Sequence, residues 1–335
     1  MIPNHTREIR LARRPVGEPT AADFELAETD IPVPGAKEFL VRGLYMSLDP
    51  YMRGRMSEAK SYAASTRIGE AMPAGGVGEV VQSNHPRFAV GDTVEGPFGW
   101  REHALSDGTG VRKIDAKLAP ISTALGVLGM PGLTAYFGLL DVCEPRPGDT
   151  LVVSAASGAV GAVVGQIGRI AGCKVVGVAG GAAKCAYVKD ELGFDAALDY
   201  RAPDFVQRLK AACADGVDVY FDNVGGPVSD AIMPLINFRA RIAVCGQIAD
   251  YNATEVPAGP RYGRFLLVNR ARMQGLIVTD WMARFPEALK RLGGWIKSGQ
   301  LKYREDVTEG IENAPAAFIG LLKGENFGKK LIKLR

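Results

Sequence analysis

The chain has 335 residues, of which 47% are hydrophobic and 23% charged, and its formal net charge at pH 7 is +3. A single hydrophobic core seldom grows beyond about 250 to 300 residues, so this length predicts two domains. The small net charge, without a dense Lys/Arg run, argues against a nucleic-acid partner. The basic side chains near the amino terminus, Arg10, Arg13 and Arg14, are expected to form a solvated edge.

Cellular location and metal binding are judged from apolar segments and from cysteine spacing. The amino-terminal segment lacks the apolar core of a secretory leader, and no stretch is long and apolar enough to cross a bilayer. The five cysteines and three histidines are dispersed, without a C-x-x-C pair. We therefore expect a cytoplasmic protein with reduced thiols, no membrane partner and no metal site.

The first part of the chain has a β-like pattern. Between Glu38 and Lys117 short apolar runs are separated by Gly, Pro and Asp, which predicts a compact β-rich domain. From about Ser122 to Leu140 the hydrophobic period becomes helical, with Pro131-Gly132 as an internal break. A domain boundary is therefore expected between Pro120 and Leu128.

The segment that follows has the pattern of a βαβ unit. An apolar run, Leu151 to Val153, enters a small-residue turn, Ala155 to Gly161, which opens a helical pattern; a second apolar run spans Val175 to Val178. Glycines in such a turn let the backbone approach a dinucleotide pyrophosphate, which the helix amides face. Because Ala156 replaces the first glycine of G-x-G-x-x-G, a turn that only packs a helix on a sheet remains an alternative.

The end of the second apolar run indicates which dinucleotide is favoured. Folds that prefer NAD carry Asp or Glu about 20 residues beyond the glycines. Here the run continues into Ala179-Gly180-Gly181 without an acid, and Lys184 follows. A cation beside a neutral, glycine-lined pocket suits a 2′-phosphate, so NADP(H) is favoured over NAD(H). The alternative for Lys184 is a solvated lysine in the first turn of a helix.

Strand and helix patterns continue to alternate, which predicts an α/β fold with a doubly wound parallel sheet. Helical patterns cover 183–192, 204–212 and 228–236, and strand patterns cover 196–198, 217–221, 241–244 and the region near Met273. Ligands bind beyond the carboxyl ends of such strands, so the loops 222–226, 245–248 and 275–278 become candidates. From Trp295 onward turns and short runs are expected, ending in a strand over 327–334 that returns to the first domain and leaves a cleft between the domains.

Several motifs in order resemble those of a known family. They read SLDPYMRGRM, MPGLTAYFGL, AASGAVG, FDNVGG, CGQIADYN and NRARMQGLIVTD. They resemble the zinc-independent branch of the medium-chain dehydrogenase/reductase superfamily, and within it the alkenal/one oxidoreductases, the group of prostaglandin reductases, plant double-bond reductases and curcumin reductase. The resemblance runs from about Ser47 to the carboxyl terminus. It implies a GroES-like β-rich domain, 1–125 completed by 300–335, a Rossmann domain, 126–299, NADPH and a homodimer.

The resemblance also assigns roles to residues that match the family motifs. The residues implied to bind the coenzyme are Ser157, Gly158, Val160 and Gly161 at the pyrophosphate, Gly181, Lys184 and Tyr200 at the 2′-phosphate, Asn223, Cys245, Ile277 and Asn326 around the nicotinamide and ribose, and Thr134. Tyr251 matches a tyrosine assigned as an acid or orienting group, and Tyr51 an aromatic near the substrate. One position departs from the family: relatives commonly read AGS ahead of the lysine, whereas Gly181 here removes a hydroxyl group and predicts a weaker preference for NADPH.

The zinc motifs of other members of the superfamily have no counterpart here. Ser47 and Met72-Pro73-Ala74-Gly75-Gly76 stand where zinc-dependent relatives supply a Cys and a G-H-E motif, which disfavours alcohol oxidation through zinc. We expect instead NADPH-dependent reduction of the C=C bond of an α,β-unsaturated ketone or aldehyde. Hydride is expected at the β-carbon, the Tyr251 hydroxyl at the enolate oxygen, and Tyr251 or water as the proton donor to the α-carbon.

Alternatives remain open for the reaction and for the two tyrosines. The chain could reduce quinones, or bind NADPH without catalysis. Tyr251 could pack over the coenzyme without a proton role, and Tyr51 could be an apolar wall. Further walls of the substrate pocket are expected from Tyr45, Tyr262 and the segment near Trp281, with 252–264 as a mobile lid.

Overall fold

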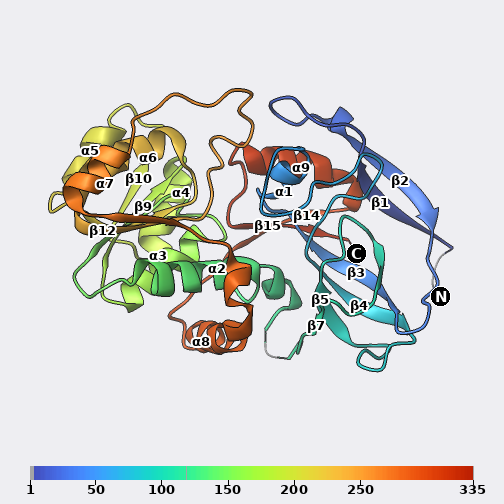
Figure 1. The fold of residues 1–335 in the computed structure, drawn as a ribbon. Coiled ribbons are helices and arrows are strands. Elements are labelled where there is room, and N and C mark those ends of the chain that lie inside the picture. The colour runs from blue at the N-terminus through green and yellow to red at the C-terminus, as the bar shows by residue number, and fades with distance from the viewer. Residues whose placement is uncertain (1–3, 118, 335) are drawn as a thin grey trace. The chain divides into compact units, whose positions relative to one another are not determined.

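The computed structural model describes residues 4–117 and 119–334, which form two compact units (Figure 1). The first unit holds the described residues up to Leu125, together with Glu305–Asn326 and the residues from Lys330 onward. The second unit holds Gly126–Arg304 and Phe327–Lys329. The domain limits expected from the sequence are 1–125 with 300–335 for one domain and 126–299 for the other. They remain predictions, because compact units need not be domains that fold separately.

The first unit is rich in β-structure. Its described strands are β1 (His5–Leu11), β2 (Phe24–Asp30), β3 (Phe39–Ser47), β4 (Gly76–Ser83), β5 (Thr93–Gly96), β6 (His103–Ser106), β7 (Arg112–Lys113), β14 (Glu305–Glu309) and β15 (Lys329–Lys333). β1 and β2 form a ribbon, and the others form one sheet in the order β14-β15-β3-β4-β5-β7, with β6 also paired to β3. β15 pairs antiparallel with β3, so the terminal strand returns to the first unit as predicted.

The core of the first unit is aromatic and includes a helix that the sequence analysis missed. Trp100 stacks on Phe24 with ring centroids 5.6 Å apart, and the ring of Phe318 meets both edge-on. Phe318 belongs to α9 (Ala314–Leu322), so the expectation of turns and short runs beyond Trp295 was wrong over this stretch. Pro315 lies in the first turn of α9, where proline is tolerated because its missing N–H has no helical partner.

The basic side chains near the amino terminus are more structured than a solvated edge. Arg10 Nε lies 2.6 Å from a Glu8 carboxylate oxygen, and Arg14 Nε lies 2.9 Å from Glu58. Arg13 Nε lies 2.7 Å from Asp23, whose side chain is buried. The expectation of a solvated edge is corrected to three ion pairs, one within β1 and two made by the segment that follows β1.

The second unit is built on a six-stranded parallel sheet in the order β10-β9-β8-β11-β12-β13. Its strands are β8 (Thr150–Val153), β9 (Lys174–Ala179), β10 (Ala196–Asp199), β11 (Val217–Asp222), β12 (Ile236–Val244) and β13 (Arg272–Gly275). The strand order reverses between β8 and β11, and such a reversal opens a crevice beyond the carboxyl ends of the strands. The predicted doubly wound sheet is confirmed.

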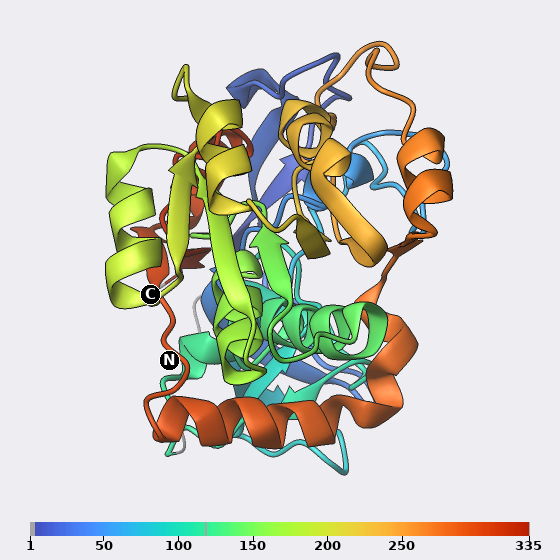
Figure 2. The same ribbon diagram turned by 90° about the vertical axis from the view of Figure 1, so that its left-hand side faces the viewer.

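Helices cover both faces of this sheet (Figure 2). Besides α9, the α-helices that the structure describes are α1 (Met52–Arg55) in the first unit, and α2 (Met130–Phe137), α3 (Gly161–Ile170), α4 (Ala182–Ala186), α5 (Phe205–Ala212), α6 (Gly226–Ile232), α7 (Gly263–Asn269) and α8 (Phe285–Lys297) in the second. α2, α3 and α8 share one core with Leu151 and Val153, whereas α5, α6 and α7 share the other with Val152. Successive residues of β8 thus point to opposite faces, which explains why the strands read as continuous apolar runs.

Two helix predictions need correction at proline residues. Pro131 does not break a helix; it lies in the first turn of α2, and the residues before Gly126 form a separate 3-10 turn, Ile121–Leu125. The helix predicted to reach residue 236 ends at Ile232 and is followed by a short 3-10 turn that contains Pro234, because the proline ring cannot continue an α-helix. Ile236 already begins β12, which is longer than predicted.

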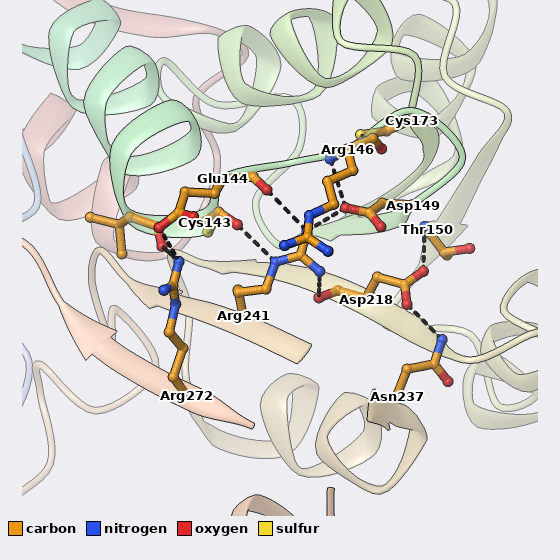
Figure 3. A network of polar contacts seen from close by, with 11 residues as sticks. Cys143, Glu144, Arg146, Asp149, Thr150, Cys173, Asp218, Asn237, Arg241 and Arg272 are labelled. Carbon is orange, nitrogen blue, oxygen red and sulfur yellow. Dashed lines mark hydrogen bonds and ion pairs between the residues drawn. The ribbon is translucent and has the colours of Figure 1, made fainter. Parts of the chain in front are cut away.

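A polar network ties the amino ends of the strands together (Figure 3). The Arg241 guanidinium of β12 donates to the carbonyl oxygens of Cys143 at 2.9 Å, Glu144 at 3.1 Å and Asp218 at 3.3 Å. It also pairs with the Asp149 carboxylate, and the two side chains are only 12% and 14% exposed. This network lies at the opposite end of the strands from the predicted ligand loops, so its role is structural.

Across the described residues, every helix is too short or too polar to cross a membrane.

Candidate active site

The turn between β8 and α3 is shaped for a ligand that approaches the backbone closely. Ala155 adopts the left-handed conformation with φ of 49°. A Cβ on Gly161 would lie 2.3 Å from the Ala155 carbonyl oxygen, so only glycine fits there. Val160 precedes the helix, and within the described chain no side chain caps the helix start. The positive end of α3 therefore faces the space beyond β8, where a pyrophosphate fits.

The carboxyl-terminal segment docks on this turn. Gly158 forms a parallel bridge with Gly328, and Ser157 beside it is buried. The neighbouring Phe327 ring lies under the Arg304 guanidinium, 3.9 Å from Cζ to the ring centroid. Asn326, a predicted coenzyme ligand, directly precedes this docked segment. The contact thus holds the segment around Gly328 on the turn between β8 and α3.

Asp222, at the carboxyl end of β11, is the centre of a buried hydrogen-bond network. Its side chain is 1% exposed and accepts five hydrogen bonds. The donors are Ser154 Oγ at 3.2 Å, Tyr220 Oη at 2.8 Å, Val224 N at 3.0 Å, Gly225 N at 2.9 Å and Ser229 Oγ at 2.7 Å. Burial, followed by the Asp222 charge, raises the pKa of Tyr220 well above its usual value, so that phenol stays a donor. The network fixes the loop after β11.

That loop carries Asn223, which is held against the end of β8. The Asn223 N–H donates to Ser154 Oγ at 2.8 Å, and its side-chain amide donates to the Ser154 carbonyl oxygen at 2.8 Å. The Tyr251 hydroxyl lies close by: a Cβ on Gly246 would be 3.1 Å from Tyr251 Oη and 3.4 Å from the Asn223 carbonyl oxygen. The Gln247 N–H donates to the same hydroxyl at 3.4 Å. The structure therefore brings the Asn223 and Tyr251 loops together.

Cys245 and Ile277 follow neighbouring strands at the same edge. The Cys245 N–H donates to the Asp222 carbonyl oxygen at 2.8 Å, and the Leu276 N–H donates to the Val244 carbonyl oxygen at 3.2 Å. Desolvation, with a smaller effect of the Asp222 charge, raises the pKa of the Cys245 thiol to about 12. The thiol is therefore neutral at physiological pH and offers no nucleophile.

The other end of the site lies where β9 and β10 finish. Gly181 has a φ of 91°, and α4, which carries Lys184, starts directly after it. A Cβ on Gly180 would lie 2.9 Å from Cε1 of Tyr200, so the Tyr200 ring covers the glycine loop. The Tyr200 N–H donates to the Ala179 carbonyl oxygen at 3.2 Å. The loop that follows β9 and the predicted phosphate ligand Tyr200 are thus neighbours.

Two predicted site residues, Thr134 and Tyr51, lie outside the loops at the carboxyl ends of the strands. Thr134 is in α2, and its hydroxyl donates to the Met130 carbonyl oxygen one turn earlier at 2.7 Å. Tyr51 belongs to the first unit, where it precedes α1. Burial, followed by the Asp49 charge, raises the pKa of Tyr51 far above its usual value. Tyr51 is therefore a neutral phenol at any physiological pH.

The predicted pocket walls have specific partners within the second unit. The Tyr262 hydroxyl, in the segment predicted to be a lid, donates to Asp230 Oδ1 of α6 at 2.8 Å. Trp281 stacks on Phe137 at 5.7 Å and donates from Nε1 to Asp141 at 2.9 Å. Trp281 thus packs against α2, and the lid remains a prediction.

Sequence reasoning did not single out Asp199 or Arg201, and it included Asp222 only as the first residue of the candidate loop 222–226. All three lie at or just beyond the carboxyl end of a parallel strand, and polar residues at that position were the signal that could have found them. Among the described residues, no group of three or more His, Cys, Asp or Glu is placed to hold a metal ion.

Two protein-family models match the chain. The family model described as the N-terminal domain of oxidoreductase matches residues 7–114, and the one described as zinc-binding dehydrogenase matches residues 159–293. The chain is 50% identical over 329 residues to the NADPH-dependent curcumin reductase of Escherichia coli (strain K12), covering 97% of this chain and 95% of the relative. It is 44% identical over 323 residues to prostaglandin reductase 1 of Rattus norvegicus, covering 95% of each. The crystal structure of CurA from Vibrio vulnificus in complex with NADPH is 51% identical, with a TM-score of 0.95, and the similarity covers 98% of this chain and 99% of that chain.

Proposed function

The chain belongs to the NADP-dependent alkenal/one oxidoreductase group of the medium-chain dehydrogenase/reductase family, and from that premise we propose that Tyr251 is its catalytic hydroxyl. Its coenzyme is NADPH, and its reaction is the reduction of the carbon–carbon double bond of α,β-unsaturated ketones and aldehydes. When bound, NADPH supplies the hydride for this reduction.

The residues of the second unit fit this coenzyme. Gly161 has no room for a Cβ, so the backbone of the turn can approach a ligand closely. The positive end of α3 begins at the same residue and favours a negatively charged pyrophosphate. β9 ends at Ala179 and two glycines follow, so no acidic side chain at that strand end competes with a 2′-phosphate. In our proposal Ser157 to Gly161 hold the pyrophosphate and Lys184 with Tyr200 hold the 2′-phosphate. Asn223, Cys245, Ile277 and Asn326 surround the nicotinamide ribose.

The position of the Tyr251 hydroxyl is the observation that carries the proposal. Reduction of an enone develops negative charge on the carbonyl oxygen, and that oxygen needs a hydrogen-bond donor. Tyr251 Oη lies at the carboxyl edge of the sheet, beside Gly246 and the Asn223 loop. A phenol, with an ordinary pKa of about 10, is better matched to an enolate than a carboxylic acid is. The hydroxyl therefore binds the enolate oxygen, and either it or water delivers the proton to the α-carbon.

The test is the Tyr251→Phe variant on a simple enone with NADPH. We expect kcat/KM to fall at least tenfold, about 1.4 kcal/mol at the transition state, with the Kd for NADPH unchanged. Tyr136→Phe is the matched control, because its hydroxyl bonds Glu287 and Arg291 in the helical layer and its loss should leave the rate within about twofold. A loss below about threefold for Tyr251→Phe would exclude the acid role.

We also propose a cytoplasmic homodimer. β13 is the edge strand of the six-stranded sheet, and its residues Arg272, Gln274 and Gly275 are exposed. Such an edge offers backbone groups that a second copy of the same strand pairs with across a two-fold axis. Light scattering on the purified protein should give twice the chain mass, and a monomer at micromolar concentration would contradict the dimer.

A further inference from the structure

Arg201, just beyond β10, lies directly over the glycine loop that follows β9. A Cβ on Gly180 would be 3.2 Å from Arg201 Nε and 3.3 Å from its Cζ. Arg201 Nε donates to the Tyr200 hydroxyl at the long distance of 3.4 Å, and the guanidinium stands 5.5 Å from the centroid of the Tyr200 ring. The cation is thus held beside the phenol that we assign to the 2′-phosphate, by a weak bond that an anion would readily replace.

The Asp199 carboxylate lies beside the same glycine loop and favours a second cation there, in addition to Lys184. Asp199, the last residue of β10, accepts the backbone N–H of Gly181 and, at 3.0 Å, that of Arg201. These two bonds, the Gly181 bond first, lower the pKa of Asp199, so the carboxylate keeps its charge at neutral pH. A 2′-phosphate bound at the glycine loop would be repelled by this fixed negative charge unless a nearby cation offset it.

The glycine loop itself offers little to the phosphate. Gly181 has no side chain, and a Cβ placed on it would meet nothing within 4 Å, so this position supplies open space rather than a hydroxyl donor. An arginine guanidinium can supply the missing hydrogen-bond donors, because its planar set of N–H groups binds phosphate oxygens in pairs. Arg208 on α5 also acts on Asp199, but only through its charge.

We propose that Arg201 is a specificity-determining residue that binds the 2′-phosphate of NADPH, supplies the donors that Gly181 cannot provide, and offsets the Asp199 carboxylate. The proposal rests on the coenzyme site proposed above. It predicts that discrimination between NADPH and NADH depends on the side chain at position 201 as well as on Lys184.

Direct binding to the whole protein tests this inference. Calorimetry or quenching of protein fluorescence would give Kd values for NADPH, NADH, adenosine 2′,5′-bisphosphate and 5′-AMP with Arg201→Gln. We expect Kd for the two ligands with a 2′-phosphate to rise about tenfold, about 1.4 kcal/mol, while those for NADH and 5′-AMP change less than twofold. Arg201→Lys should recover part of the loss, since it keeps the charge without the paired donors.

Arg208→Gln is the matched control, because it removes one positive charge near Asp199 without touching the glycine loop. We expect this variant to change Kd for NADPH less than threefold. Equal losses in Arg201→Gln and Arg208→Gln, or an Arg201→Gln variant that binds NADPH as the unaltered protein does, would overturn the proposal. An unaltered protein that does not bind NADPH more tightly than NADH would instead contradict the coenzyme site itself. Unchanged NADH binding shows that each variant is folded.

Discussion

At the scale of single residues, Asp222 is the side chain whose role depends most on distant segments. Its five donors come from the end of β8, from β11, from the loop after it and from α6. The motif FDNVGG drew attention to Asn223, but a sequence does not show that Ser154 and Ser229 meet one carboxylate. Asn223 could therefore be proposed as a coenzyme ligand from the sequence, whereas the role of Asp222 in positioning its loop could not.

The Asp222→Asn variant tests this positioning role. The uncharged amide oxygen that replaces Oδ1 accepts more weakly from the loop amides of Val224 and Gly225, and the amide group that replaces Oδ2 no longer accepts from Ser229, at a cost of about 1–3 kcal/mol. We expect the loop after β11 to shift, raising Kd for NADPH about tenfold while Kd for adenosine 2′,5′-bisphosphate, which lacks the nicotinamide end, stays within about twofold.

Ser229→Ala is the control for Asp222→Asn. It removes the hydroxyl that bonds Asp222 Oδ2 and the Tyr220 hydroxyl, each at 2.7 Å, and leaves the loop amides of Val224 and Gly225 bonded to a carboxylate. Its effect on both ligands should be smaller. If Asp222→Asn weakened both ligands equally, the carboxylate would have a general structural role only.

At the scale of elements, Arg241 joins β12 to the starts of β8 and β11 and to the carbonyl oxygens of residues 143–144, so its loss should destabilise the second unit. Arg241→Met removes the cation paired with the largely buried Asp149 carboxylate, which among the described residues keeps only the Arg146 N–H, and it removes the donor of three carbonyl oxygens. Removing one partner of such a pair costs about 3 kcal/mol, which should lower the Tm by roughly 6–12 °C. Thermal unfolding followed by circular dichroism would measure the shift.

Arg272→Met serves as the comparison for Arg241. Arg272 pairs with Glu144, but both side chains are about half exposed, 49% and 57%, so solvent screens the pair. Such pairs contribute about 0–1 kcal/mol, and the Tm should fall by only a few degrees. Similar Tm losses in the two variants would show that burial of the Arg241 network adds nothing.

At the scale of the whole molecule, the predictable parts were those set by hydrophobic period. Apolar runs such as Leu151 to Val153, alternating with helical patterns, predicted the parallel sheet because each strand is buried on both faces. The loops at the strand ends then followed from the geometry of such sheets. The β1–β2 ribbon and the position of Asp199 and Arg201 beside the glycine loop were not predictable, because they depend on contacts between different segments of the chain. The helix α9 was missed because Pro315 suggests a break in the sequence, whereas in the structure it lies in the first turn of the helix.

Leu331 of β15 completes a hydrophobic cluster of the first unit. β15 lies between β14 and β3, and Leu331 has no exposed surface, packing in one cluster with Val77, Ala124 and Leu125. Leu331→Ala should lower the free energy of unfolding of the first unit by about 2–5 kcal/mol, because it leaves a cavity in this buried cluster.

The two units have separate cores, so the destabilisation should be local. Hydrogen exchange is expected to speed up in peptides from β3 and β4 and to stay unchanged in those from β8 and α3, and Kd for NADPH should change less than twofold. Lys333→Ala, which removes only the pair with exposed Glu309, should leave both sets of peptides as they are. If Leu331→Ala loosened β8 and α3 as much as β3, the units would unfold as one, and the separate stability argued from their cores would be wrong.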